Sequence, residues 1–185
     1  MSTAHGPLLT LEPLIDAVRE GVEGHGWAMS GLQKTTSHQF EGRWEGESTR
    51  SAYLFFHRPD RWDAVGIDVY LDETSRGLQG TLSLVVEGPR LGGLGDPSEA
   101  LAVLGAAAVE RLPRGYRTPI SLRVRLPQPE ADPATSEVEV RFKVRIPAAA
   151  VERGAADVAS VASVAVRSFE SLLRHPGIQD LMVLE

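Results

Sequence analysis

The stretch HRPDRWD, at residues 57–63, holds the side chains that come nearest to a catalytic set. His57, Asp60 and Asp63 lie close together in sequence, and a histidine beside carboxylates can act as a general acid or base. No nucleophile or metal partner can be identified for them, and two arginines in the same stretch can neutralise the aspartates. We interpret the stretch as a salt-bridged turn and expect no enzyme. An enzyme that uses His57, Asp60 and Asp63 is the alternative.

Residues that bind metals or cofactors are sparse. The chain has no cysteine, which excludes disulfides, thiolate nucleophiles and cysteine-based zinc or iron–sulfur sites. The histidines are scattered, and none has a second ligand at metal-binding spacing. We therefore expect neither a metal nor a cofactor. The five histidines are His5, His25, His38, His57 and His175.

A glycine cluster, Gly92, Gly93 and Gly95, lies between a predicted strand and a predicted helix, where a phosphate-binding loop would be found. The cluster lacks the Lys-Ser/Thr pair of a P-loop and the full dinucleotide-binding pattern. Asp96 also places a carboxylate where a phosphate would need positive charge. A flexible connector is the favoured interpretation.

The most informative polar pattern belongs to two predicted strands near the C-terminal end. Basic residues alternate with apolar ones in both strands, which puts five cations on one solvent-facing side: Arg123, Arg125, Arg141, Lys143 and Arg145. This basic face either neutralises nearby acidic residues such as Glu137 and Glu139, which we favour, or binds an anion or an acidic partner. No aromatic residue is predicted to be exposed among the cations, which disfavours nucleic acid because bases stack on exposed aromatic rings.

Periodicity predicts the elements of the first half of the chain. Apolar residues recur at helical spacing from Leu11 to Val22, and glycines follow. Alternation then takes over, and the short connections imply antiparallel strands. The predicted elements are a helix over 11–22, strands around Phe40 and Trp44 and over 51–57 joined at 46–49, and strands over 65–71 and 82–86 with a turn near Gly77.

In the second half, Asp96, Pro97 and Glu99 are typical of a helix start: an N-cap, a first-position proline and a third-position carboxylate. Two half-buried strands follow and form a hairpin with a long loop. The predicted elements are a helix with the stripe Leu101, Leu104, Ala108 and Leu112 that ends at 113–115, and strands over 120–126 and 138–146 joined by the loop 127–135.

The last predicted helix has a wide apolar face. Its apolar residues are separated by alternating steps of four and three, which is a heptad stripe. Many of them are small, and small residues let a helix approach its neighbours closely. We favour packing on the chain's own sheet, and a dimer interface is the alternative. The stripe consists of Val151, Ala155, Val158, Ala162, Ala165, Phe169 and Leu172.

The order of elements is helix, strands, helix, two strands, helix, which predicts an α+β fold with helices covering one face of an antiparallel sheet. The chain is 42% hydrophobic and 24% charged, as in ordinary globular proteins. We expect a flexible N-terminus over 1–9, a single domain over 10–176 and a C-terminal tail over 177–185.

The net charge is −6, and the acidity belongs to the first part of the chain. Residues 1–116 hold 10 basic and 16 acidic side chains, whereas residues 117–185 hold nine of each. An acidic protein is not drawn to phosphate backbones, so we do not expect nucleic acid to be the main partner. The first residues do not form a signal-peptide pattern, and no apolar run is long enough for a membrane span. A cytoplasmic protein without membrane contact is the expectation.

The order of elements resembles that of the YbjN family and of the type III secretion chaperones that share its fold. The segments that carry the resemblance are the middle helix DPSEALAVLGAAAVERL, the strand VEVRFKVRIP and the final helix VASVAVRSFESLL, and the likeness covers about residues 10–175. It implies a non-enzymatic, often dimeric protein that binds other proteins. It assigns no family site to individual residues.

We therefore expect a homodimeric, chaperone-like adaptor that holds a protein client. Its net acidity favours a basic client, such as a nucleic-acid-binding protein and in particular one that binds single-stranded DNA. The alternative is direct binding of nucleic acid or another anion by the basic face.

Overall fold

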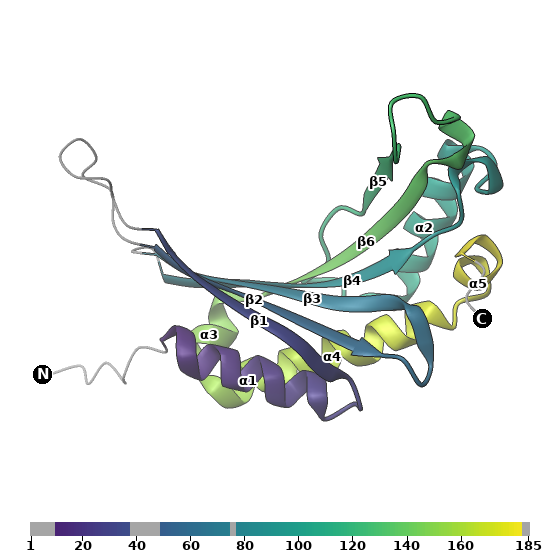
Figure 1. Ribbon diagram of the computed structural model, residues 1–185. Helices are drawn as coiled ribbons and strands as arrows, with labels where there is room; N and C mark the ends of the chain where they lie inside the picture. Colours follow the sequence, from purple (N-terminus) through teal and green to yellow (C-terminus); the bar gives the residue numbers. More distant parts are fainter. Residues whose placement is uncertain (1–9, 38–48, 75–76, 183–185) are drawn as a thin grey trace, which may run out of the picture.

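A computed structural model of the protein describes residues 10–37, 49–74 and 77–182 (Figure 1). In these ranges the chain forms a six-stranded sheet of order β1-β2-β3-β4-β6-β5, and every neighbouring pair is antiparallel. The strands are β1 (Ala28–Ser37), β2 (Thr49–Arg58), β3 (Trp62–Thr74), β4 (Gly77–Glu87), β5 (Ser121–Arg125) and β6 (Glu137–Ile146).

Helices accompany the sheet, which confirms the predicted α+β fold. They are α1 (Leu11–Glu23), α2 (Pro97–Arg111), α3 (Ala148–Arg153), α4 (Ala155–Leu173) and α5 (Pro176–Met182), with single 3₁₀ turns at Leu91–Gly93 and Pro133–Thr135. The predicted first helix, the predicted start of α2 and the pairing of the last two strands are confirmed, but β5, predicted to be half-buried like β6, has no buried residue, and its Val124 is 45% exposed. Asp96 caps α2, since its side chain accepts hydrogen bonds from the backbone N–H groups of Ser98 and Glu99.

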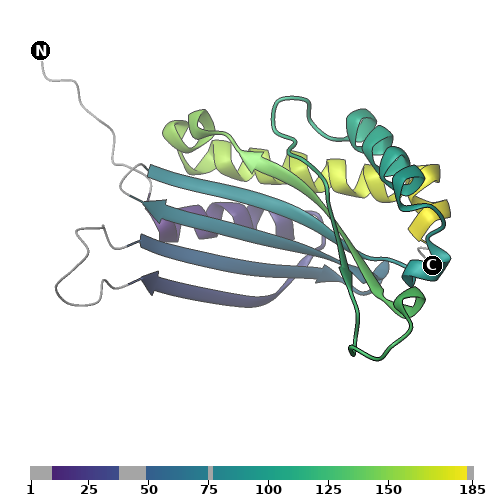
Figure 2. The ribbon, with the colours of Figure 1, turned by 90° about the horizontal axis from the view of Figure 1, so that it is seen from above.

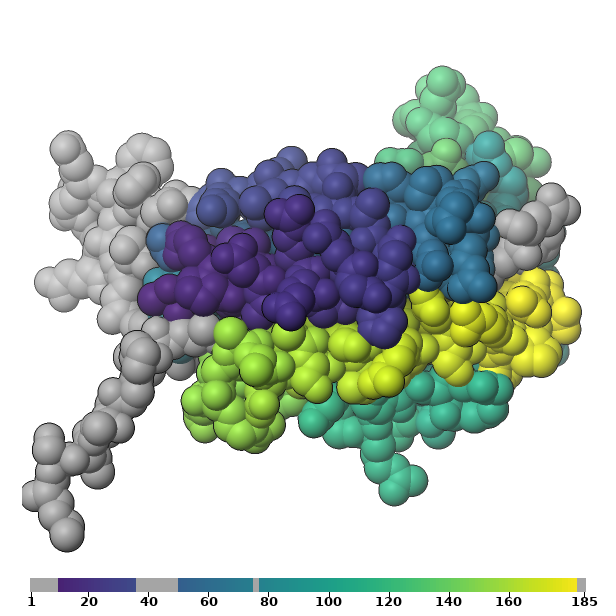
Figure 3. Space-filling model, turned by 90° about the horizontal axis from the view of Figure 1, so that it is seen from below, coloured from purple at the N-terminus to yellow at the C-terminus, as the bar shows by residue number. Residues whose placement is uncertain are grey.

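The helices gather on one side of the sheet. α1, α4 and α2 lie side by side across this side (Figure 3), whereas in the opposite view the strands lie in front of α1 and α4 (Figure 2). No helix of the described ranges covers that second side. β5 and the part of β6 that lies beside it rise out of the plane of the other strands (Figure 1). The sheet therefore has a covered side and an open, curved side.

Alternation along the strands separates these two sides. In β3, Val65, Ile67, Val69 and Leu71 are buried while the residues between them are not. The same period of two runs through β6, from Val138 to Ile146. The predicted assignment of one buried and one solvent-facing side to each of these strands is confirmed.

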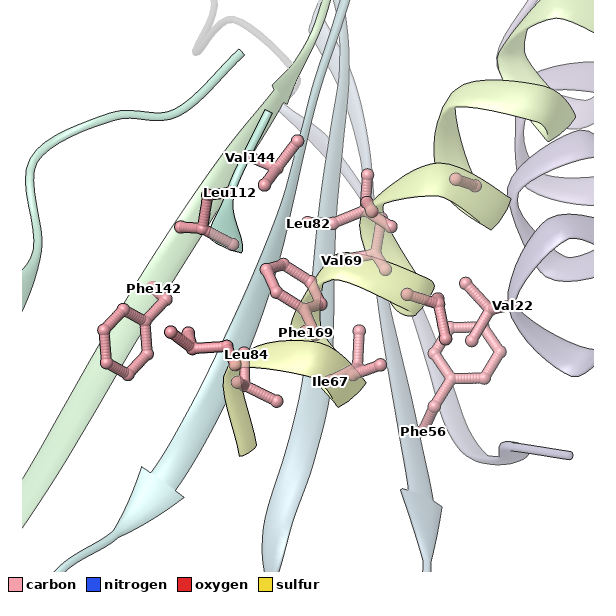
Figure 4. Packing of buried hydrophobic residues seen from close by; sticks show 14 of the residues in the cluster. Val22, Phe56, Ile67, Val69, Leu82, Leu84, Leu112, Phe142, Val144 and Phe169 are labelled. Atoms are coloured by element: carbon pink, nitrogen blue, oxygen red, sulfur yellow. The ribbon is translucent and has the colours of Figure 1, made fainter. Parts of the chain in front are cut away.

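The part of the heptad stripe from Val158 to Leu172, which lies in α4, is buried inside the subunit. Val158, Ala162, Ala165 and Phe169 have no exposed surface. Phe169 points at the sheet amid side chains of β3 and β4 (Figure 4). The favoured prediction, that this helix packs on its own sheet, is confirmed, and this stripe is not the surface for a second subunit.

The first edge of the sheet differs from the sequence interpretation. β1 was not predicted, because its sequence AMSGLQKTTS shows no alternation. A β-bulge between Met29 and Gly31 shifts the register, so Met29 pairs with Phe56 and Leu32 with Leu54. The predicted strand around Phe40 and Trp44 lies outside the described residues.

The last predicted helix is divided in two. Gly154 has a φ of 112°, a conformation that favours glycine, and it separates α3 from α4. Residues 177–185, expected as a tail, include most of α5, whose Ile178 and Met182 are buried. Leu101, expected in the stripe of α2, is 42% exposed, and Ala100 and Ala107 are buried instead.

No helix in the described ranges combines the length and the apolar character that a membrane span requires.

Candidate functional site

The candidate site is the uncovered side of the sheet, which we call the open face. Neighbouring strands align its side chains in rows: Tyr53 pairs with Tyr70, Tyr70 with Thr81, and Thr81 with Arg145. A parallel row joins Phe55, Asp68, Ser83 and Lys143. The open face consists of Gly31, Gln33, Ser51, Tyr53, Phe55, His57, Gly66, Asp68, Tyr70, Asp72, Thr81, Ser83, Val85, Glu139, Arg141, Lys143 and Arg145.

An aromatic pair occupies the middle of the open face. The ring centroids of Tyr53 and Tyr70 are 4.8 Å apart with a tilt of 43°. The two residues are 40% and 38% exposed. Tyrosine combines a large contact area with little conformational freedom to lose, so an exposed pair is a strong anchor for a partner.

Hydrogen bonds hold the tyrosine pair on one side. The Ser51 hydroxyl donates to the Asp72 carboxylate at 2.9 Å, and its oxygen lies 3.4 Å from the Tyr70 hydroxyl oxygen. Phe55 lies half-buried next along β2 from Tyr53. The pair is therefore held in place before any partner arrives.

The predicted basic residues divide into paired and unpaired groups. Arg141 donates to Asp68 at 2.9 Å and to Glu139 at 2.7 Å. Burial raises the pKa of the Asp68 carboxyl above its ordinary value, against the opposing effect of Arg141. Arg141 therefore neutralises the half-buried carboxylates of Asp68 and Glu139.

Arg123 and Arg125 also face carboxylates. Arg125 donates to Glu137 at 2.6 Å, which lowers the pKa of that carboxyl, and Arg123 lies 3.9 Å from a Glu139 oxygen. A hollow of about 370 Å³ at this end of the sheet is lined by three cations and three acidic residues, so it attracts neither sign of charge strongly. Its lining is Glu87, Gly88, Arg90, Arg123, Arg125, Glu137, Val138 and Glu139.

Lys143 and Arg145 differ from the other three. Neither forms an ion pair with any residue in the described ranges. Arg145 is exposed and Lys143 is half-buried, and both lie on the open face of β6. These two cations supply the uncompensated positive charge of the predicted basic face.

The candidate catalytic residues do not converge. His57 is exposed on the open face, whereas Arg58, the next residue, reaches Glu170 of α4 on the covered side at 2.8 Å. Asp60 is an exposed turn residue whose carboxylate lies 3.7 Å from the Arg58 guanidinium, and Asp63 is exposed on β3. This agrees with the interpretation of a salt-bridged turn. Among the described residues, no cluster of three or more His, Asp or Glu side chains is placed to hold a metal ion.

The tyrosine pair was missed in the sequence because it depends on pairing between strands. Tyr53 and Tyr70 are far apart in the chain and become neighbours only through the β2–β3 register. The one available signal was their position between buried residues, since each lies between two apolar residues of its strand.

Comparison with known proteins does not extend these observations, since no family model, curated protein or solved structure matches the chain.

Proposed function

We propose that the protein is a non-enzymatic, chaperone-like adaptor that binds a protein client through the open face. The observation that supports this most is the exposed Tyr53–Tyr70 pair at the centre of a sheet side that no described helix covers. Tyrosine and arginine are enriched where proteins bind each other, and both are present here beside serine and threonine hydroxyls. The resemblance to the YbjN family and the type III secretion chaperones agrees with a binding role, and we place this role in the cytoplasm as part of the proposal.

Direct binding of nucleic acid or another anion is the second candidate. Its support is the row in which Tyr70, Thr81 and Arg145 stand on adjacent strands, since an aromatic ring and a cation together suit a single strand. Against it, Arg123, Arg125 and Arg141 are already paired with carboxylates, and Asp68 and Asp72 flank the tyrosines. A protein client therefore fits the open face better.

A homodimer is also part of the proposal, and the outer side of α2 is the surface that suits it. Leu101 and Val109 are 42% and 65% exposed on this side. Glu99 near one end of α2 and Arg114 beyond the other are exposed and form no ion pair within the described ranges. Two antiparallel copies of α2 would bring Glu99 of each beside the partner's Arg114 and bury the apolar residues between them.

Affinity capture with matched variants tests the adaptor function. Tyr53→Asp with Tyr70→Asp alters the open face, and Leu32→Asp changes a residue of similar exposure (39%) on β1 outside it. If the protein is an adaptor, the wild type should capture at least one specific protein. The recovery of that protein should fall about tenfold when the double variant is used and should not change with Leu32→Asp. That protein, once purified, should bind the wild type saturably. If no recovered protein depends on the open face, the proposal is wrong.

A further inference from the structure

The unpaired cations and the tyrosine pair together select one kind of client segment. We propose that the open face binds an extended segment whose carboxylates pair with Lys143 and Arg145 and whose aromatic side chain packs on Tyr53 and Tyr70. This inference rests on the proposed function, because it names the part of the client that is held.

The charge of the bound client segment can be inferred from the cations of the open face that form no ion pair. Lys143 and Arg145 carry positive charge that no carboxylate in the described ranges neutralises. Their neighbours on β4 are the neutral Ser83 and Thr81. Asp68 and Asp72 lie beside the tyrosines instead. A carboxylate is therefore stabilised over β6, and an uncharged ring is favoured over β2 and β3.

The net acidity of the protein does not argue against an acidic segment, because the acidity lies elsewhere. The outer side of α1 carries the exposed carboxylates Glu12, Asp16 and Glu20, and α1 packs on the covered side of the sheet. The basic client expected from the net charge would bind the acidic outer side of α1. The open face attracts the opposite charge.

The strand register sets the spacing of the segment. Tyr70 and Arg145 stand in one row two strands apart, which is about 10 Å. An extended chain advances about 3.3 Å per residue and points every second side chain to the same face, so carboxylates two and four residues after the aromatic residue, about 7 and 13 Å along the segment, share its face and bracket this distance. Lys143 lies about 7 Å from Arg145 along β6, at right angles to this row and therefore about 12 Å from Tyr70, so the second carboxylate comes within reach of its long side chain. The segment therefore crosses the strands.

Fluorescence anisotropy with a labelled peptide tests this arrangement. The probe is an extended Ser/Gly peptide with one Phe, a Glu two residues later and a second Glu two residues after that, so that all three side chains share one face. Comparison peptides replace both Glu by Gln, both Glu by Lys, or Phe by Ala. We expect saturable binding of the probe at low salt and about tenfold weaker binding of each comparison peptide.

Protein variants assign the binding to the open face. The double variant Lys143→Glu with Arg145→Glu should bind the probe peptide about tenfold more weakly than the wild type does. It should instead bind the comparison peptide in which both Glu are replaced by Lys. Arg167→Glu is the control, because Arg167 is an exposed cation of α4 on the covered side with no ion pair in the described ranges. It should leave binding unchanged. Melting temperatures establish that each variant is folded.

The possible failures can be told apart. If affinity capture finds a client that depends on the open face while the probe peptide does not bind, the acidic segment is wrong and the adaptor function stands. If capture finds no such client, the adaptor function itself is wrong. If a single-stranded DNA oligonucleotide binds more tightly than the peptide and loses binding in Lys143→Glu with Arg145→Glu, the ligand is nucleic acid and the inference is overturned.

Discussion

Arg58 and Glu170 join the end of β2 to the last turns of α4. The Arg58 guanidinium donates to a Glu170 carboxylate oxygen at 2.8 Å and to the His25 carbonyl oxygen at 2.7 Å. The Trp27 indole N–H donates to the same Glu170 oxygen at 3.1 Å. The side chains of Arg58 and Glu170 are only 18% and 12% exposed. Removing one charge therefore leaves the other poorly solvated.

Glu170→Gln should lower the free energy of unfolding by about 2 kcal/mol, because Arg58 keeps its charge and loses its carboxylate partner in a largely buried place. Urea denaturation followed by tryptophan fluorescence measures the change, and Trp27 reports on the site directly. Glu20→Gln is the matched control, since Glu20 is exposed on α1 and should change stability by less than about 0.5 kcal/mol. Equal denaturation midpoints for Glu170→Gln and the wild type would contradict the argument.

At the scale of residues, the sequence predicted which charged residues share a face but not which of them form ion pairs. The alternation of Arg141, Lys143 and Arg145 in β6 was visible because it is local. That Arg141 pairs with Asp68 while Lys143 and Arg145 stay unpaired depends on the β3–β4–β6 register, which local spacing cannot give. The same limit concealed the Tyr53–Tyr70 pair.

At the scale of elements, α1 and α4 cross in close contact at Gly21. A Cβ placed there would collide with the carbonyl oxygen of Ala159 and lie 2.7 Å from the Ala162 Cβ. The small residues of α4 were predicted to permit close packing, and the partner in this contact is α1 as well as the sheet. The contact was not predictable, because helix periodicity does not say which helices meet.

Gly21→Ala should therefore destabilise the protein by about 2 kcal/mol, since the two helices must separate to admit the methyl group. Gly105→Ala, in the middle of α2, is the control, and it should change stability in the opposite direction. It is made in the Val109→Glu background, so that the proposed α2–α2 contact is absent. A Cβ at Gly105 meets no atom within 4 Å, so the better helix propensity of alanine should stabilise by about 0.5–1 kcal/mol. Thermal or urea unfolding compares them, and destabilisation of similar size in both variants would refute the packing argument.

The strands show the same division between local and distant information. β3, β4 and β6 could be predicted because buried apolar residues recur at every second position along much of each strand. β1 could not, because the bulge at its start reverses the alternation between Met29 and Leu32 and its residues from Gln33 onward are polar. Its strand conformation depends on pairing with β2.

At the scale of the whole molecule, the sheet separates two surfaces of different character. The covered side holds the core and the acidic α1, and the open side holds the tyrosine pair and the unpaired cations. With α4 buried, the exposed apolar residues of α2 are the surface proposed for a second subunit, away from the open face. Client binding and dimer formation can then occur together.

Sedimentation equilibrium tests the dimer. The chain has a mass of 20.0 kDa, and the wild type should sediment at twice that mass. Val109→Glu should shift it to the monomer mass, because a buried charge would stand at the α2–α2 contact. Leu32→Glu, on the opposite edge strand, should leave the dimer intact. A wild type that stays at the monomer mass at high concentration would disprove this part of the proposal.

The position of α4 in the chain affects how the protein is made on the ribosome. Residues 155–173 follow all six strands, and their buried side chains cover the sheet together with α1. A nascent chain that has emerged only as far as Ile146 has every strand but lacks the helix that shields Ile67, Leu82 and Leu84. The growing polypeptide therefore keeps an exposed apolar sheet surface until residues 155–173 emerge, and translational pausing before that point lengthens the exposure.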